Sequence, residues 1–178
     1  MYVFRRLAVS LFASSRRSKL APGEADVTVT YATPWDMDMF AEMNNGRVLS
    51  VYDVGRFALA VRGGLIGAIR RRGWIITVAG SNAQYRRRIR MFQRIEIRSR
   101  VLGRDDRFFY LEQSMFTKAG PASNIIYRTA VTDRNGLVPI DEVVAEMGFP
   151  DWNPPLPDWV AKWAEADKLR PWPPAEMV

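Results

Sequence analysis

The chain has 178 residues, of which 48% are hydrophobic and 25% are charged. This length and composition fit one globular domain with tails and argue against intrinsic disorder or a fibrous repeat. The chain contains no cysteine and no histidine, which excludes disulfides, thiolate catalysis, cysteine-ligated metal sites and histidine as a general base. Any hydrolysis must therefore use carboxylates, hydroxyl groups or backbone dipoles. No apolar run approaches the roughly 20 residues that span a bilayer.

Positive charge is concentrated in the middle of the chain. Residues 62–107 contain 13 arginines and three acids, a net charge of +10, whereas the whole chain carries +7. Residues 137–178 carry eight acids and three bases, a net charge of −5. Arginine suits bidentate binding of phosphate or carboxylate, but the alternation of apolar and charged residues along 94–102 favours a solvated strand face. No signature of a nucleic-acid-binding motif accompanies the charge, so nucleic acid is not expected as a partner.

The N-terminal segment 1–21 is expected to contain an amphipathic helix over residues 2–13. Its apolar residues recur at spacings of three and four: Phe4, Leu7, Ala8 and Leu11. Packing of this stripe against the body of the protein is the simplest interpretation, and contact with a membrane surface through the flanking arginines is the alternative. The apolar stretch is short for a cleaved signal peptide, so a cytoplasmic location is the simplest expectation.

Residues 22–148 have the pattern of one α+β domain. A first strand over 25–33 stops at Pro34, and a long helix over 44–62 is ended or bent by the glycine pair at 63–64. Four further strands are predicted, at 74–91, 94–102, 107–118 and 123–133. The short connections imply antiparallel neighbours, so one sheet wrapped around one central helix is expected.

The C-terminal part contains one short helix over 139–147, closed by Gly148, and then a tail rich in proline and tryptophan over 149–178. Its four tryptophans are at positions 152, 159, 163 and 172. Tryptophans left in water favour aggregation, so the tail is expected to wrap the body, with one helix near 157–168.

The most informative stretch, residues 35–49, lies between the first strand and the long helix and reads Trp-Asp-Met-Asp-Met-Phe-Ala-Glu-Met-Asn-Asn-Gly-Arg-Val-Leu. It resembles the hotdog-fold acyl-CoA thioesterases, in the thioesterase-like branch related to 4-hydroxybenzoyl-CoA thioesterase, whose motif runs roughly Asp-x-Asp-x-x-x-His-Met-Asn-Asn-x-x-Tyr-Leu. The resemblance extends from about Asp26 to Met147. It implies the hotdog fold, a homodimer or dimer of dimers, and an acyl-CoA substrate in the interface groove, without metal or organic cofactor.

The resemblance also implies that Asp38 is the catalytic carboxylate, acting as base for a water or as nucleophile on the thioester carbonyl. Backbone N–H groups near the helix start, from Met43 to Asn45, are expected to face the thioester oxygen. Asn44 and Asn45 then cap the helix, position the loop or touch substrate. Helix capping is the competing interpretation for Asp38 and the favoured one for Asp36.

Two residues depart from the family motif. Glu42 stands where the family often has histidine, and Val48 stands where tyrosine is expected. Glu42 either acts as a second carboxylate beside Asp38 or marks a changed function. A serine triad is excluded because the chain has no histidine.

Further substrate-binding candidates lie on the strand after the long helix. Ser81, Asn82 and Tyr85 are on the strand that in such folds runs near the opposing subunit's site, although exposed polar residues on strands are common. Arg86 and Arg88, with their arginine neighbours at 87 and 90, are candidates for binding the CoA phosphates.

These observations favour a thioesterase that hydrolyses an acyl thioester to a free acid and CoA. The second interpretation keeps the fold but makes the protein a non-catalytic acyl-thioester or lipid-binding protein, and its main support is Glu42. The third makes the basic face and the N-terminal helix a membrane-surface attachment, with the fold as scaffold.

Overall fold

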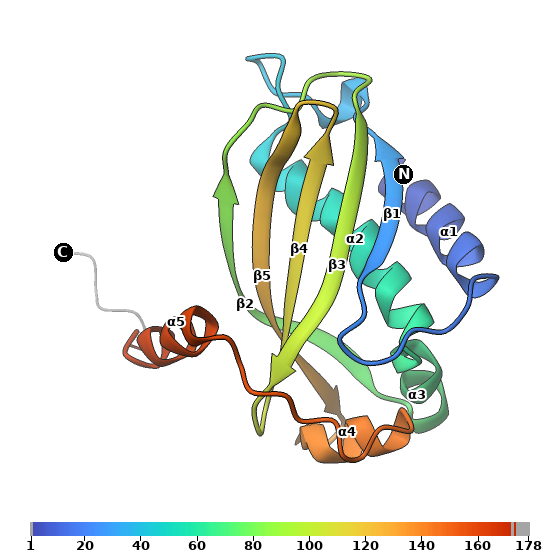
Figure 1. Cartoon of the computed structure of the whole chain (residues 1–178), viewed down its shortest axis with the longest axis vertical. Coiled ribbons are helices and arrows are strands. Elements are labelled where there is room, and N and C mark those ends of the chain that lie inside the picture. The colour runs from blue at the N-terminus through green and yellow to red at the C-terminus, as the bar shows by residue number, and fades with distance from the viewer. Residues whose placement is uncertain (1, 172, 174–178) are drawn as a thin grey trace.

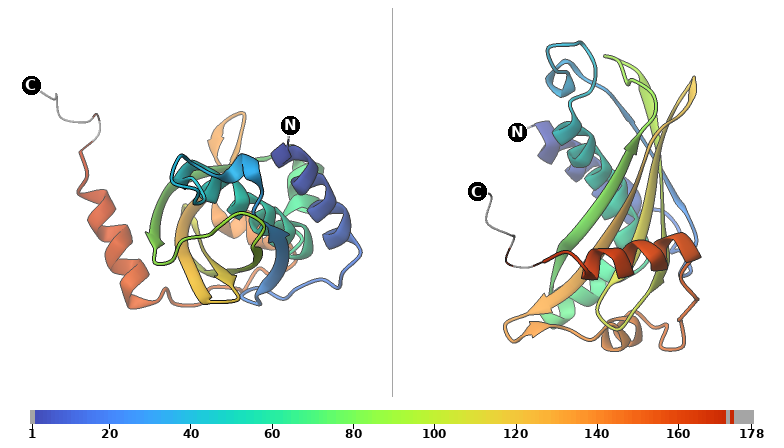
Figure 2. Two further views of the ribbon diagram at one scale, coloured as in Figure 1. Left: turned by 90° about the horizontal axis from the view of Figure 1, so that it is seen from above. Right: turned by 90° about the vertical axis from the view of Figure 1, so that its left-hand side faces the viewer.

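The computed structural model describes residues 2–171 and 173. A long helix, α2 (Asn45–Arg62), lies at its centre, and one antiparallel sheet curls around it in the order β1-β3-β4-β5-β2, with β6 paired to β5 (Figures 1 and 2). The strands are β1 (Asp26–Tyr31), β2 (Ile75–Tyr85), β3 (Arg94–Arg104), β4 (Phe109–Thr117), β5 (Gly120–Asp133) and β6 (Gly136–Leu137). The expected hotdog fold, one sheet wrapped around one helix, is confirmed.

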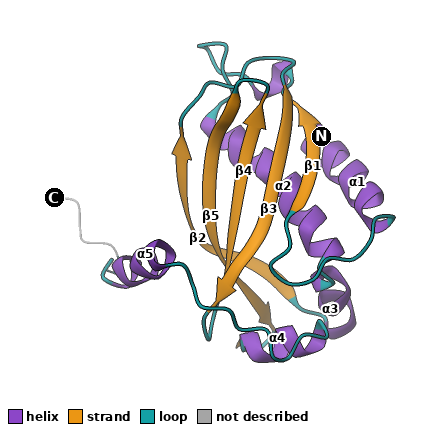
Figure 3. Cartoon of the chain, viewed as in Figure 1, coloured by secondary structure: helices purple, strands orange, loops and turns teal. Residues whose placement is uncertain are grey.

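The other helices cover the ends and outside of this core (Figure 3). They are α1 (Tyr2–Ser15), the 3-10 turn η1 (Pro34–Asp36), α3 (Leu65–Arg72), α4 (Ile140–Glu146) and α5 (Asp158–Lys168). Helix α3 was not expected: the glycine pair at 63–64 ends α2, but Gly64 has a φ of 86° and starts a new helix. The strand predicted over 74–91 is shorter, because pairing with β5 ends at Tyr85.

The core lies between α2 and the concave face of the sheet. Residues on this side of α2 pack against inward-facing residues of β3, β4 and β5; among them are Val48, Val51, Tyr52, Ile95, Ile97, Leu111, Met115 and Ile125. One polar group is built into this contact. The Gln113 side chain donates to the Tyr52 carbonyl at 3.0 Å and to Ser99 Oγ at 2.7 Å, which ties the middle of α2 to the sheet.

Strand β3 shows the alternation that was expected of it. Ile95, Ile97 and Ser99 are buried, whereas Arg94, Arg98 and Arg100 are exposed. Arg98 pairs with Glu96 at 2.9 Å and Arg100 with Glu112 at 2.8 Å on the outer face of the sheet. The solvated-strand interpretation is therefore confirmed for this part of the arginine cluster.

The N-terminal helix packs against α2, as the simplest interpretation required. Leu7 and Leu11 of the predicted stripe are half-buried, and two serines complete the buried face. Ser10 and Ser14 are buried, and Ser10 Oγ donates to the Val54 carbonyl at 3.1 Å. Phe4 and Ala8, two members of the predicted apolar stripe, are exposed. Small serine side chains let α1 lie close to α2, which the apolar periodicity does not reveal.

The tail wraps the body, as expected, over the outer face of the sheet (Figure 2). The ring of Trp163 in α5 meets Tyr110 edge-on at 6.2 Å between centroids, and Asp167 pairs with Arg128 at 2.5 Å. The acidic C-terminal part also neutralises arginines of the basic middle, since Arg71 pairs with Glu146 at 2.7 Å. Trp172 lies outside the described residues.

No helix in the described part of the chain combines the length and the apolar character needed to cross a membrane.

Candidate functional site

The loop before α2 is organised by Asp36, which is fully buried. Its Oδ2 accepts from the Thr33 backbone N–H at 2.9 Å, from the Thr33 hydroxyl at 2.8 Å and from Arg6 at 2.7 Å. Arg47 Nε lies 3.5 Å from the other carboxylate oxygen. Burial alone raises the pKa of Asp36, but the hydrogen bonds from Thr33 and Arg6 outweigh it and hold that pKa below its ordinary value. Asp36 therefore has a structural role, as favoured, but it belongs to the capping box of the 3-10 turn η1 with Thr33 and does not cap α2, whose N-cap is Asn44.

Asp36→Asn is expected to destabilise the protein by about 3 kcal/mol at pH 7, because it leaves the Arg6 guanidinium facing a neutral group. Since the folded pKa of Asp36 is lowered, its stabilisation is present above the unfolded pKa of about 4 and is lost as pH falls through the folded pKa. Urea unfolding at pH 7 and at about pH 3 checks this. The difference between wild type and variant must shrink at the lower pH, while the exposed control Asp151→Asn changes little at either pH. A difference in unfolding free energy between wild type and Asp36→Asn that does not depend on pH would contradict the stabilising role of the ionised Asp36 carboxylate.

Asp38 lies two residues further on, in a tight turn that precedes α2. Its Oδ1 accepts from the Phe40 N–H at 2.8 Å and weakly from the Glu42 N–H at 3.4 Å, and its own N–H donates to the Glu42 carbonyl at 2.8 Å. Ala41 completes the turn with a φ of 56°, in the left-handed region. Asp38 is half-buried, and its Oδ2 accepts no hydrogen bond from any described residue. One oxygen therefore holds the turn, and the other is left without a partner among the described residues.

A groove of ≈ 470 Å³ lies at this end of α2. It brings together six of the nine residues that the sequence singled out for catalysis or substrate binding: Asp38, Glu42, Asn45, Tyr85, Arg86 and Arg88. The carboxylates come from the loop before α2, and the arginines come from the connection between β2 and β3. Residues distant in the chain thus meet because β2 ends beside the start of α2.

The groove combines a carboxylate pair with a run of cations. Arg88 Nε lies 2.9 Å from Glu42 Oε2, so Glu42 is paired across the groove. Arg87 donates to the Ala119 carbonyl in the turn between β4 and β5. Arg86, by contrast, makes one long contact of 3.4 Å to Gln84 within the described chain. Arg86 is therefore the arginine of this run that is best placed to receive an external anion.

The helix start offers fewer donors than the sequence suggested. Met43 N–H donates to the Ile89 carbonyl and Asn44 N–H to the Asp36 carbonyl, at 2.9 and 2.8 Å. The Asn44 side chain caps α2 by accepting from Gly46 N–H at 2.9 Å. Of the expected set from Met43 to Asn45, the Asn45 N–H alone has no partner among the described residues. Asn44 is thus a capping residue and does not line the groove.

Ser81 and Asn82 do not line the groove either. Both are exposed in the middle of β2, several residues from its end at Tyr85. Among the described strands, β2 pairs with β5 alone, so its other edge is open. A role for Ser81 and Asn82 therefore requires a second molecule at this edge.

The groove also has members that sequence reasoning missed. Ser123 of β5 lines it, is buried, and shares a 2.7 Å hydrogen bond with the Tyr52 hydroxyl of α2. Burial raises the pKa of Tyr52, which keeps its hydroxyl protonated. The groove also has apolar lining residues, among them Met43, Val48 and Ile89. Nothing in the sequence around Ser123 distinguishes it from an ordinary strand serine.

Among the described residues there is no group of three or more side chains of the kinds that usually hold a metal ion. The polar groups that line the groove are two carboxylates, three guanidinium groups, the N-terminus of α2 and the hydroxyl groups of Tyr85 and Ser123. Such a set can bind an anionic ligand and activate a water molecule beside it.

Comparison with known proteins assigns this architecture. The sequence profile of the thioesterase-like superfamily matches residues 32–164. Protein THEM6 of Drosophila melanogaster is 30% identical over 173 residues, which cover 94% of this chain and 84% of the fly protein. Protein THEM6 of Xenopus laevis is 42% identical over 80 residues, 45% of this chain, and the match spans 39% of the frog protein. The DHNA-CoA thioesterase of Staphylococcus aureus has a similar fold, with a TM-score of 0.61 at 16% identity over 82% of this chain and 92% of that one.

Proposed function

The chain belongs to the thioesterase-like superfamily, and we propose that it hydrolyses an acyl-CoA or a related acyl thioester to the free acid and CoA. The observation that carries this proposal is the groove at the start of α2. There Asp38, with one unengaged carboxylate oxygen, lies beside the arginine run 86–88. A carboxylate and an anion-binding surface in one groove are what a CoA thioesterase without histidine requires.

In the proposed reaction, Asp38 Oδ2 takes a proton from a water molecule, and the resulting hydroxide attacks the thioester carbonyl carbon. The tetrahedral intermediate then collapses, its carbon–sulfur bond breaks, and the leaving thiolate receives the proton from Asp38. The Asn45 N–H at the helix N-terminus, which has no partner among the described residues, is proposed to stabilise the negative charge on the carbonyl oxygen. Direct attack of Asp38 on the carbonyl, with water opening the resulting anhydride, is the second route to the same products.

Glu42 is proposed to position the turn that carries Asp38. Its ion pair with Arg88 connects the turn that carries Asp38 to the connection that follows β2, at 2.9 Å. The family histidine is thereby replaced by a charged contact across the groove. This pairing fixes the distance between the carboxylate and the arginines that hold the substrate.

The arginine run is proposed to bind the CoA phosphates. Arg86→Gln is expected to raise KM for acyl-CoA about fivefold and to leave kcat nearly unchanged, since an exposed charge pair contributes roughly 1 kcal/mol and the phosphates lie far from the reacting carbonyl. The matched control is Arg100→Gln, which removes an arginine from the outer face of the sheet. Steady-state kinetics with acyl-CoA and with the acyl-pantetheine thioester check this. An equal effect of Arg86→Gln on both substrates contradicts phosphate binding.

The active form is proposed to be a homodimer, or a dimer of dimers, in which β2 strands pair. The edge of β2 is open, and along the other edge of the sheet Arg6 and Arg17 donate to the Tyr31 and Val27 carbonyls of β1. These contacts occupy strand carbonyls that would otherwise pair with another molecule. Pairing through β2 brings Ser81 and Asn82 to the partner's groove.

A non-catalytic acyl-thioester-binding protein is the second candidate. The observation in its favour is that Asp38 Oδ1 holds a turn and Glu42 is neutralised by Arg88. Purified protein mixed with acyl-CoA thioesters of short, long, branched and aromatic acyl groups distinguishes the two. Free CoA is followed with a thiol reagent, which does not react with this cysteine-free chain. CoA release supports the thioesterase, and saturable acyl-CoA binding without release supports the second candidate.

A further inference from the structure

The face of α1 that points away from the protein is apolar. Phe4, Val9 and Phe12 are 75%, 63% and 58% exposed, and Ala8 and Ala13 are exposed beside them. At about 100° of rotation per residue, the three large side chains fall within an arc of about 140°. A surface helix in water usually has its polar residues on this side. Figures 1 and 2 show α1 at the edge of the molecule, with no other described element over its outer side.

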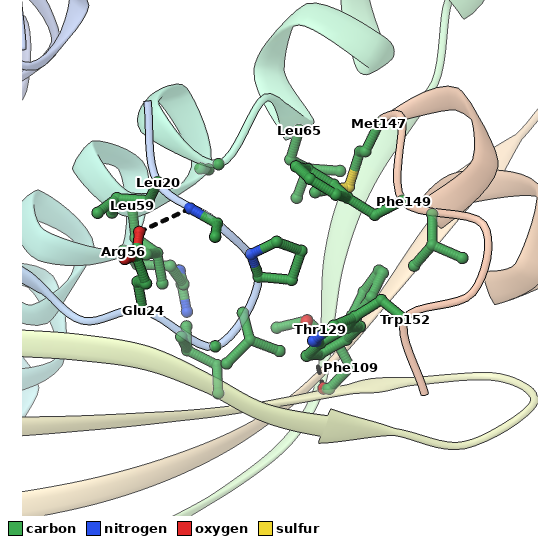
Figure 4. A pocket seen from close by; sticks show the side chains of 18 of the residues that line it. Leu20, Glu24, Arg56, Leu59, Leu65, Phe109, Thr129, Met147, Phe149 and Trp152 are labelled. Atoms are coloured by element: carbon green, nitrogen blue, oxygen red, sulfur yellow. Dashed lines mark hydrogen bonds between the residues drawn. The ribbon is translucent and has the colours of Figure 1, made fainter. Parts of the chain in front are cut away.

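The contacts at the two ends of α1 fix this orientation. Near its start Arg6 donates to Asp36 at 2.7 Å, and just after its end Arg17 pairs with Asp26 at 2.9 Å. Both carboxylates are buried. Further along the chain, Leu20 lies in the wall of an apolar cavity at the C-terminal end of α2 (Figure 4). The apolar face of α1 therefore cannot turn inward without breaking ion pairs to two buried carboxylates.

The outer side of α1 also carries positive charge. Residues 1–23 contain four arginines, one lysine and no acid. Two of the arginines are held in the ion pairs just described. The other three cations, Arg5, Arg16 and Lys19, are exposed and form no ion pair with any described residue. The guanidinium of Arg16 lies 3.7 Å from the centre of the Phe12 ring, so cation and apolar group share one surface.

Strand β1 extends this surface. Its outward-facing residues Val27, Val29 and Tyr31 are all exposed. They line one groove of ≈ 480 Å³ together with Arg5 and Val9 of α1. Apolar side chains of two elements therefore meet along this edge of the sheet, and an arginine lies among them.

An anionic lipid bilayer is the partner that fits these properties. An interfacial helix inserts protruding apolar side chains among lipid head groups, and basic residues beside them bind the anionic lipids. The apolar residues of α1 protrude singly from a convex face, which suits a bilayer better than the contoured surface of another protein. A second copy of this chain, placed on α1 by a two-fold axis, would bring cations against cations.

We propose that α1 docks along its length on the surface of an anionic lipid bilayer. Phe4, Val9 and Phe12 insert among the lipids, and Arg5 and Arg16 contact the phosphate groups. The attachment uses the β1 edge of the sheet and leaves the open edge of β2 free, because the two strands are the opposite edges. The proposal goes beyond the proposed hydrolysis and does not rest on it.

Flotation of the purified protein with two kinds of vesicle tests the charge preference. One kind is phosphatidylcholine alone, and the other contains about 30% phosphatidylserine. Binding to the anionic vesicles is expected to be at least about tenfold tighter, and to weaken as salt rises to about 1 M, because salt screens the charges. No binding to the anionic vesicles, or equal binding to both kinds, overturns the proposal.

Phe4→Ser/Phe12→Ser tests the apolar face. Both residues are exposed, so the double variant is expected to fold, which circular dichroism checks, and to bind anionic vesicles at least about tenfold more weakly. The control Leu169→Ser removes an exposed apolar residue at the end of α5 and is expected to bind as wild type does. Unchanged binding of the folded double variant overturns the proposal. A change in its sedimenting mass assigns the face to a second copy and also overturns it.

Arg5→Gln/Arg16→Gln tests the cations. Each cation near an anionic surface strengthens binding roughly fivefold, so a loss of about thirtyfold on anionic vesicles is expected. Arg134→Gln/Arg170→Gln removes two exposed cations far from α1 and is the control of equal net charge. An equal loss in both double variants would attribute binding to net charge and overturn the proposal. These measurements use no thioester, so they are independent of whether the protein hydrolyses acyl-CoA.

Discussion

Asp38→Asn is expected to lower kcat for acyl-CoA hydrolysis by roughly 10³-fold, since the loss of a general base typically removes a factor of 10²–10⁴. The substitution is informative because asparagine retains a side-chain oxygen at the position of Oδ1. That oxygen still accepts from the Phe40 N–H, so the turn before α2 is kept. The amide that replaces Oδ2 cannot take a proton from water. Measurement of CoA release at saturating acyl-CoA, with circular dichroism as a check on folding, separates the catalytic role of Asp38 from its role in the turn before α2.

Glu42→Gln is the matched control for this change. It also replaces a carboxylate by an amide in the same turn, but Glu42 is neutralised by Arg88 and has a positioning role. Its loss of kcat is expected to be about tenfold, well below that of Asp38→Asn. An Asp38→Asn protein with the wild-type kcat would contradict the catalytic assignment. Asp38 would then have only its structural role in the turn before α2.

Gly55→Ala is expected to destabilise the fold by roughly 2–3 kcal/mol, because the added Cβ overpacks the contact between α2 and the sheet. A Cβ at this position would lie 2.6 Å from Ile97 Cγ2, 2.8 Å from Ser99 Oγ and 3.0 Å from Gln113 Nε2. These groups are buried in the contact between α2 and the sheet, so none moves freely. Relief of the clash requires α2 to shift or the hydrogen bond from Gln113 to the Tyr52 carbonyl to break. Urea unfolding midpoints check this.

Gly67→Ala makes the same chemical change in α3 and is expected to have the opposite sign. The nearest atom to its added Cβ is Arg71 Nη1 at 3.3 Å, the end of a flexible side chain. The gain in helix propensity, up to about 1 kcal/mol, is then the dominant effect. A Gly55→Ala protein as stable as wild type would contradict the close contact between α2 and the sheet.

The overall fold was predictable because its strongest signals are local. The long helix and the alternation along β3 are periodic patterns that the core requires. The predicted turn residues lie between consecutive strands in the structure. Helix α3 was missed because three consecutive arginines end it, and they were considered only as charge. Two of them pair with acids of α4, a contact across the chain that no local pattern contains.

The candidate site was predictable where the motif is contiguous and less so elsewhere. Asp38, Glu42 and Asn45 lie within eight residues of one another, and the family resemblance pointed to them directly. Arg86 and Arg88 were expected from charge, whereas the arginines of β3 were expected on a solvated strand face, where Arg98 and Arg100 form surface ion pairs. Ser123 was missed, since its place beside Tyr52 arises from the register between β5 and the helix. A role for Ser81 and Asn82 in substrate binding would require a second molecule at the open edge of β2.

The measurement that tests most directly whether the groove at the start of α2 is the acyl-CoA site, on which the proposed hydrolysis depends, is hydrogen–deuterium exchange of the purified protein with and without a thioether analogue of an acyl-CoA, which cannot be hydrolysed. The account predicts slower exchange in two segments that line the groove, 38–48 and 85–90, with the second segment unprotected when the analogue lacks its phosphates. Protection confined to other parts of the chain, with both groove segments unchanged, would contradict the account.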